Sequence, residues 1–160
     1  MAKRLVHEMV YDASMTEVAA MLADPAFREE VCERQGVISA LVSIDSNDAG
    51  MQVTIDQVQS ARGIPSFARK FVGEEINIVQ EESWSTPTEC DITVTIPGKP
   101  GEMTGTARLT QSGGTTTETV EMTIKVNIPL VGGKIEGLIS DLLLDALRAE
   151  NAAGRDYLSR

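Results

Sequence analysis

The sequence predicts an α+β fold in which a curved, seven-stranded antiparallel sheet wraps around one long C-terminal helix. Apolar residues recur at every second position for about ninety residues after Gly36, as in strands with one dry and one wet face. Over residues 130–158 they recur at steps of three and four, as in an amphipathic helix. The predicted order is one strand, two short helices, six strands and the long helix, in a single domain over residues 1–160.

A strand and a capped helix are the first predicted elements. Residues 4–11 alternate loosely between apolar and polar side chains, which predicts a strand. Ser14 and Glu17 form the S-x-x-E capping box, in which each side chain bonds a free backbone donor of the other residue. A helix should therefore begin at Met15.

The second helix and the remaining strands follow from local signals. Asp24 and Pro25 supply an N-cap and a first-turn proline, and Gly36 should end this helix. Six alternating segments separated by turn residues then predict strands over residues 38–44, 51–57, 76–84, 90–96, 103–110 and 119–126. Each has one wet face, so the sheet should be covered on one side only.

The long helix should supply that cover. Its apolar face is made of Ile135, Leu138, Ile139, Leu142, Ala146, Ala149, Ala153 and Tyr157. A helix of about 28 residues is about 40 Å long, whereas a ten-residue strand is about 33 Å long. The helix is therefore long enough to cross the whole sheet.

Composition and charge exclude several classes of function. A formal net charge of -10 argues against nucleic-acid binding and against general adhesion to anionic membranes, which both require a surplus of Lys and Arg. Cys32 and Cys90 form no CxxC or other close pair, so we expect two reduced, buried thiols.

The termini give no sign of export or membrane insertion. The basic N-terminal stretch would need an apolar centre to act as a signal peptide, but His7 and Glu8 interrupt it. The apolar stretch near the C-terminus is broken by Asp141 and Asp145 and is too short to span a bilayer. We therefore expect a cytoplasmic protein.

Three segments, together with the order of elements, carry a family resemblance. They are YDASMTEVAAMLADPAFRE, GTARLT and IPLVGGKIEGLI. They resemble the START-like (SRPBCC) superfamily of polyketide cyclases, birch-pollen-allergen-type ligand carriers and lipid-transfer domains, and more narrowly an uncharacterised bacterial branch of it. The resemblance covers nearly the whole chain and implies the helix-grip fold, with a cavity between the concave face of the sheet and the long helix. It brings no catalytic motif, because none is found at matching positions.

The inward faces of the strands and helix would form the wall of this cavity. Together with two phenylalanines of a later segment, they give the predicted ligand-binding residues: Val53, Ile55, Gln57, Phe67, Phe71, Ile78, Gln80, Glu82, Ile92, Val94, Ala107, Met122, Ile124, Leu138 and Leu142. Gln57, Gln80 and Glu82 are polar but in phase with apolar neighbours. They either orient a ligand or lie near strand ends or a bulge that reverses the register. If Glu82 is enclosed, burial should raise its pKa.

Residues 62–73 form a basic segment in an acidic protein. They contain three positive charges and two of the three phenylalanines of the chain, Phe67 and Phe71, and residues 66–72 are compatible with one or two helical turns. One hypothesis is a lid over the cavity mouth that touches an acidic ligand group or makes transient contact with a membrane. The other is a loop whose phenylalanines fill the core.

Catalytic and metal chemistry have weak candidates only. His7, Tyr11 and Glu82 are the groups that could transfer protons, but a lone histidine among apolar neighbours is more often a hydrogen-bonded core residue. No nucleophile motif surrounds a Ser or Cys. One His and scattered carboxylates make no metal site, so we expect neither a metal nor a cofactor.

The preferred interpretation is a non-catalytic carrier or sensor of a small hydrophobic or amphipathic molecule, lipid-like or polyketide-like. A cyclase or aromatase that uses the same cavity, with His7, Tyr11, Gln80 or Glu82 acting on the substrate, is one alternative. A protein-interaction module with a filled core and an acidic docking face is another. Converging polar groups in the cavity would favour the enzyme. An unbroken apolar cavity would favour the carrier, and a solid core would favour the interaction module.

Overall fold

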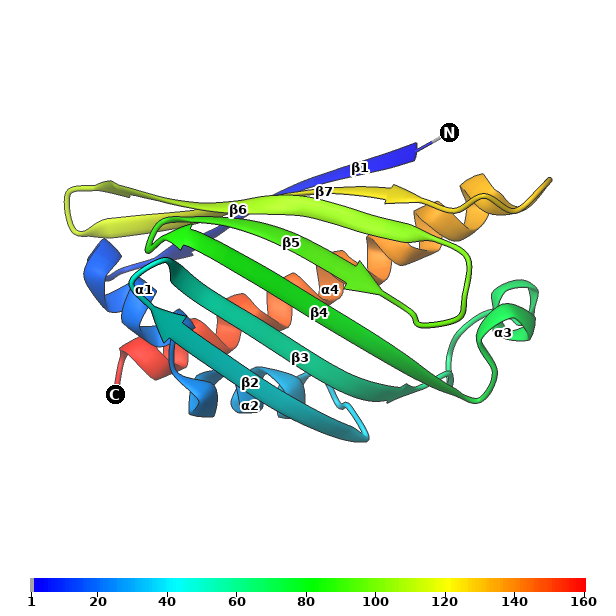
Figure 1. The fold of residues 1–160 in the computed structure, drawn as a ribbon, viewed down its shortest axis with the longest axis horizontal. Helices are drawn as coiled ribbons and strands as arrows, with labels where there is room; N and C mark the ends of the chain where they lie inside the picture. The colour runs from blue at the N-terminus through cyan, green and yellow to red at the C-terminus, as the bar shows by residue number, and fades with distance from the viewer. Residues whose placement is uncertain (1) are drawn as a thin grey trace.

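The computed structural model describes residues 2–160 and has the predicted α+β architecture, a seven-stranded antiparallel sheet with a long C-terminal helix (Figure 1). The strands are β1 (Ala2–Tyr11), β2 (Ser39–Asn47), β3 (Gly50–Ser60), β4 (Glu75–Thr86), β5 (Glu89–Thr95), β6 (Glu102–Ser112) and β7 (Thr115–Lys125). The helices are α1 (Met15–Leu22), α2 (Pro25–Arg34), α3 (Ser66–Val72) and α4 (Gly132–Leu158).

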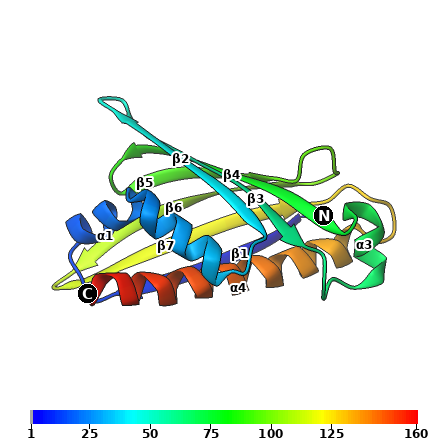
Figure 2. The same ribbon diagram turned by 90° about the horizontal axis from the view of Figure 1, so that it is seen from below.

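The sheet has the strand order β1-β7-β6-β5-β4-β3-β2, and every neighbouring pair is antiparallel. β1 and β2 lie at opposite edges because α1 and α2 carry the chain from one edge to the other. Figure 2 shows α4 running along one face of the sheet, with α1 and α2 toward its C-terminal end and α3 beside its N-terminal end. No helix within residues 2–160 is long and apolar enough to cross a membrane.

The predicted helix boundaries are confirmed by the caps. The Ser14 hydroxyl accepts from the Glu17 backbone N–H, and the Glu17 carboxylate accepts from the Ser14 backbone N–H, both at 3.2 Å. Asp24 accepts from the backbone N–H two residues later at 3.0 Å. Gly36 follows α2 with a φ of 73°, a left-handed conformation that glycine adopts without steric cost.

α3 is a helix that the predicted order omits. Its seven residues lie between β3 and β4, in the basic segment that the sequence singled out. Gly73 ends it with a φ of 81°, so the chain can turn sharply into β4.

The two halves of α4 pack differently. In the C-terminal half, Ala153 is fully buried, and Gly154 lies so close to the buried Tyr11 ring that an added Cβ would come within 2.5 Å of it. In the N-terminal half, Leu138 and Ile139 are only partly buried although they face the sheet, and Leu142 is exposed. The incomplete burial of Leu138, Ile139 and Leu142 leaves a space beside this part of α4.

Candidate ligand-binding site

A hollow of about 730 Å³ occupies that space, between α4, the inner faces of β3 to β6, and α3. Its volume lies in the range of roughly 300–1,000 Å³ that small-molecule sites occupy. Its apolar wall includes Ile76, Ile78, Val94, Ile96, Met103, Val126, Ile135, Leu138, Ile139, Leu142, Ala146 and Ala149. The side of α3 that faces the hollow contributes Ala68 and Phe71.

The predicted wall residues divide into two groups. On the wall of the hollow lie Gln57, Phe71, Ile78, Gln80, Val94, Leu138 and Leu142. Away from it lie Val53, Ile55, Phe67, Glu82, Ile92, Ala107, Met122 and Ile124. The aliphatic and sulfur side chains of the second group lie in the hydrophobic core, Glu82 is held in an ion pair, and Phe67 packs beneath the Lys134 ammonium group.

Several wall residues were on the correct faces in the sequence but were not assigned to the site. Examples are Ile76 and Met103 on the sheet and Ile139 and Ala146 on α4. They share the period of the assigned residues. Periodicity tells which face a side chain occupies, but not how far along the strand the core is filled.

Three glutamine side chains provide polar groups on the wall. Gln57, Gln59 and Gln80 line the hollow, and the Gln59 Nε2 donates to the Gln57 Oε1 at 2.9 Å. The Gln80 Nε2 donates to Glu82. Gln57 and Gln80 therefore face inward, as one of the two sequence hypotheses required, and their remaining amide groups can bond a ligand.

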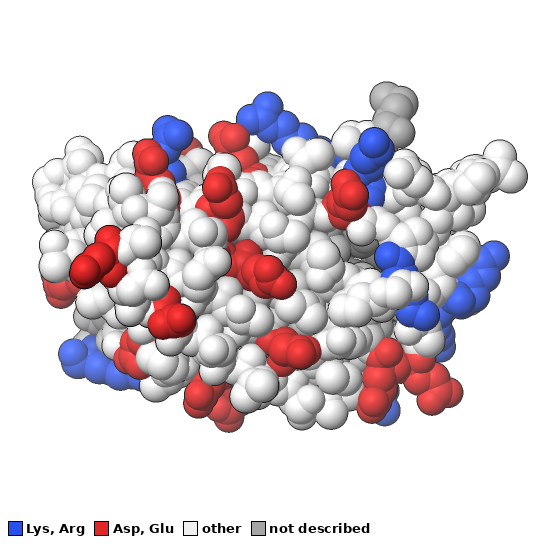
Figure 3. All heavy atoms as spheres, in the orientation of Figure 1, with Lys and Arg blue, Asp and Glu red and all other residues white. Residues whose placement is uncertain are grey.

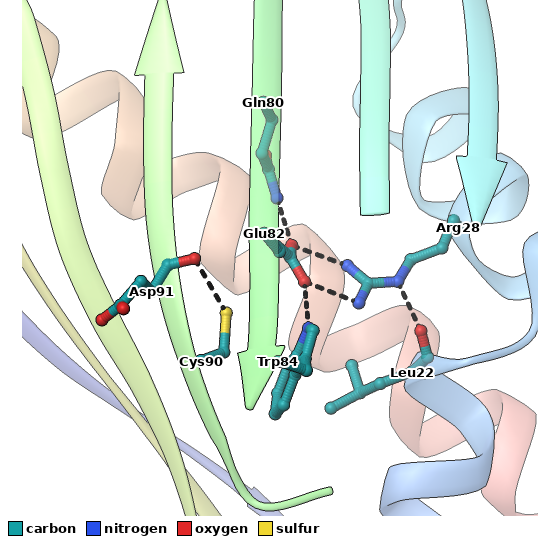
Figure 4. Close-up of polar contacts among 7 residues, drawn as sticks. All are labelled: Leu22, Arg28, Gln80, Glu82, Trp84, Cys90 and Asp91. Atoms are coloured by element: carbon teal, nitrogen blue, oxygen red, sulfur yellow. Dashed lines mark hydrogen bonds and ion pairs between the residues drawn. The ribbon is translucent and has the colours of Figure 1, made fainter. Parts of the chain in front are cut away.

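Glu82, which follows Gln80 by two residues on β4, forms an ion pair with Arg28 (Figure 4). They are 5% and 2% exposed, and the Arg28 Nη1 and Nη2 donate to the two Glu82 oxygens at 2.9 and 2.8 Å. The Arg28 Nε donates to the Leu22 carbonyl at 2.8 Å, and the Trp84 Nε1 donates to Glu82 at 2.9 Å. This network joins α2 to β4 and holds the Gln80 amide at the wall of the hollow.

The predicted rise in the Glu82 pKa is wrong. Burial does favour the neutral acid, but the Arg28 charge and the hydrogen bonds from Arg28, Trp84 and Gln80 outweigh it and lower the pKa. Sequence reasoning missed Arg28. Arg28 lies on the buried face of α2 with Phe27, Val31 and Cys32. A charged residue at helical spacing from apolar ones was the available signal.

Two further carboxyl groups, one on β7 and one on α4, have raised pKa values. Glu118 on β7 is buried, and within residues 2–160 its Oε1 has no hydrogen-bond partner. Burial and then the charges of Glu150 and Glu82 raise its pKa well above the usual value. Burial also raises the pKa of the partly buried Glu150 on α4 to about 7, with Arg28 opposing and Glu82 assisting the rise. Both carboxyl groups therefore retain their protons to higher pH than an exposed glutamate would.

The weak catalytic candidates do not lie on the wall of the hollow. Tyr11 is fully buried, its hydroxyl points to the Met9 sulfur at 3.8 Å, and burial raises its pKa. His7 is half-buried on β1, paired in register with Val120. Glu82 is held by Arg28. Within the described part of the chain, no group of three or more His, Cys, Asp or Glu residues is placed to hold a metal ion. Cys32 and Cys90 are free and buried, as expected.

A seven-stranded antiparallel sheet packed against one long C-terminal helix defines the START-like helix-grip fold. The protein TTHA0849 from Thermus thermophilus is similar, with 17% identity and a TM-score of 0.67 over 96% of this chain and 95% of that one. The di-domain ARO/CYC BexL from the BE-7585A biosynthetic pathway has 15% identity and a TM-score of 0.69 over 97% of this chain and 49% of BexL. Norcoclaurine synthase from Thalictrum flavum has 14% identity and a TM-score of 0.63 over 100% of this chain and 88% of the synthase.

The chain belongs to the family described as "Protein of unknown function (DUF2505)", which matches residues 6–158. Uncharacterized proteins of Mycobacterium tuberculosis and Mycobacterium bovis are 29% identical over 153 residues, which cover 88% of this chain and 87% of each relative. Identities of 14–17% to the solved structures show the predicted helix-grip fold alone, and the family match with its mycobacterial relatives fits the expected uncharacterised bacterial branch.

Proposed function

We propose that this protein is a non-catalytic binder or carrier of a small hydrophobic or amphipathic molecule, held in the hollow between α4 and the sheet. The observation that carries the proposal is the character of the wall. It combines an aliphatic surface from both layers with the amides of Gln57, Gln59 and Gln80. Apolar surface supplies affinity, and a few amides supply orientation.

The placement of the titratable groups favours binding over catalysis. A general acid or base must reach the atom whose proton it transfers. The groups with altered proton affinity, Glu118, Glu150 and Tyr11, are not on the wall of the hollow, and Glu82 is neutralised by Arg28. The amides that are on the wall bind hydrogen-bonding groups but do not act as general acids or bases near neutral pH.

Similar folds support a small-molecule role. One solved structure of Thalictrum flavum norcoclaurine synthase contains dopamine and hydroxybenzaldehyde, and its TM-score with this chain is 0.61. That protein binds two aromatic compounds on the same kind of scaffold. The wall residues of the present chain are chiefly aliphatic, which favours an aliphatic ligand, lipid-like or polyketide-like, over a flat aromatic one.

The test fills the hollow and measures binding of a neutral probe. Decanol should bind the purified protein in calorimetric titration, and Ala146→Trp should abolish binding because the indole occupies the space beside α4. Ala152→Trp is the matched control, since Ala152 is exposed on the same helix. Both variants should retain the wild-type circular dichroism spectrum. Equal binding by both variants, or a wild type that binds neither decanol nor a charged ten-carbon amphiphile, would refute the proposal. Native mass spectrometry would reveal a copurified ligand.

A further inference from the structure

Four charged residues among residues 2–160 line the hollow: Arg34, Arg62, Lys99 and Asp145. Arg34 is neutralised, because its Nη2 lies 2.7 Å from Asp156 and 3.3 Å from Glu30. Asp145 has a cation at 3.9 Å, the guanidinium of the residue three positions later. Across residues 2–160, no carboxylate lies within 4.0 Å of the side-chain nitrogens of Arg62 or Lys99. The unpaired charges on the wall are therefore both positive.

The two unpaired cations come from loops at one end of the molecule. Arg62 lies between β3 and α3, and Lys99 lies between β5 and β6. Figure 1 places both loops at the end that carries α3. In Figure 3, blue side chains gather toward this end, with a red group beside them, whereas the middle of the visible face carries mainly red. In a chain with a net charge of -10, two free cations on the wall of an apolar hollow are a local reversal of sign.

We propose that the ligand is an amphiphile with an acidic group at one end, a carboxylate or a phosphate monoester, and that Arg62 and Lys99 bind this group. The inference rests on the proposed function and specifies its ligand class. The aliphatic part would lie along Ile78, Leu138 and Ile139. Arg62 and Lys99 are exposed, but a guanidinium and an ammonium group beside a low-polarity wall attract an anion more strongly than the same groups fully surrounded by water. A neutral or cationic head group would leave both charges without a partner.

The test compares decanoate, decyl phosphate, decanol and decylamine, which share one alkyl chain, by calorimetric titration at pH 8 and low salt. Decanoate or decyl phosphate should bind at least about tenfold more tightly than decanol, a difference of about 1.4 kcal/mol. Decylamine should bind most weakly. In the double variant Arg62→Gln/Lys99→Gln the preference for the acids over decanol should fall to less than about threefold.

The matched control is Lys3→Gln/Arg108→Gln. It removes the same formal charge from exposed positions that do not line the hollow, so it should keep the wild-type preference. Equal binding of decanol and the two acids, tightest binding of decylamine, or an acid preference that survives in Arg62→Gln/Lys99→Gln would each overturn the inference while the carrier function stands. If none of the four probes binds the wild type, the carrier function itself fails, and the inference fails with it.

Discussion

Replacing Arg28 with Met should lower the free energy of unfolding by about 3–5 kcal/mol at pH 7, the cost expected when one partner of a buried ion pair is removed. Arg28 makes two charge-assisted hydrogen bonds to Glu82 and one to the Leu22 carbonyl, at 2.8–2.9 Å. The variant loses all three and leaves the Glu82 carboxylate in the core with only the Trp84 and Gln80 donors. Methionine retains much of the apolar volume, so a cavity adds little to the cost.

The assay is urea unfolding followed by circular dichroism, for wild type, Arg28→Met, Glu82→Gln and the double variant. Because the double variant leaves no unpaired buried charge, its loss of stability should be at least about 2 kcal/mol smaller than the sum of the two single losses. The Arg28→Met penalty should also shrink toward pH 5, since without the guanidinium the Glu82 pKa rises and the group becomes neutral. Losses that add to within about 0.5 kcal/mol would refute the claim that these two charges stabilise each other.

Three more outcomes are expected. The Glu150 pKa is about 7 in the folded chain, above its usual 4.5. The contribution of protonated Glu150 to the free energy of unfolding is therefore fully present below pH 4.5 and is lost as pH rises through 7. Glu150→Gln should therefore gain about 1–2 kcal/mol over wild type in urea unfolding at pH 8 and almost nothing at pH 4.5, a gain discounted because the side chain is partly accessible; an equal gain at both pH values would contradict this. Gly154→Ala should destabilise by about 1–3 kcal/mol because its Cβ meets the Tyr11 ring, whereas Gly137→Ala on the same helix, with no atom within 4 Å of its Cβ, should stabilise by about 0.5–1 kcal/mol in the same assay. If α3 is a lid, Phe71→Ser should speed decanol association at least about threefold in stopped-flow mixing; an unchanged rate would favour the alternative that Phe71 only fills the core.

The fold could be predicted because its signals are local. The capping box at Ser14, the N-cap at Asp24 and the left-handed Gly36 act within a few residues, and each is visible in the sequence. The alternating strands show which face is dry, and their register carries the dry positions to the inside. Local capping and periodicity therefore agree with the global fold, which is what an unfrustrated sequence provides.

The candidate site could be predicted only in part because its shape depends on distant contacts. Whether a dry residue faces core or hollow depends on how α4 packs, and the close approach of Gly154 to Tyr11 is a contact between the two ends of the chain. The sign of the Glu82 pKa shift depends on Arg28, which lies on another element. Neither fact is contained in the residues next to the position concerned.

The pairing of β1 with β7 joins the first strand of the sheet in sequence order to the last, from Tyr11 with Thr116 to Ala2 with Lys125. Each of the other strand pairs joins consecutive strands of the sequence, so those hairpins can form early at a low cost in chain entropy. Within residues 2–160, β1 has β7 as its sole neighbour in the sheet and packs against α4, which ends at Leu158. During synthesis the first strand is therefore made long before its partners exist. The sheet and α4 should pack together only after α4 has left the ribosome. Chains truncated within α4 should remain open and prone to aggregation.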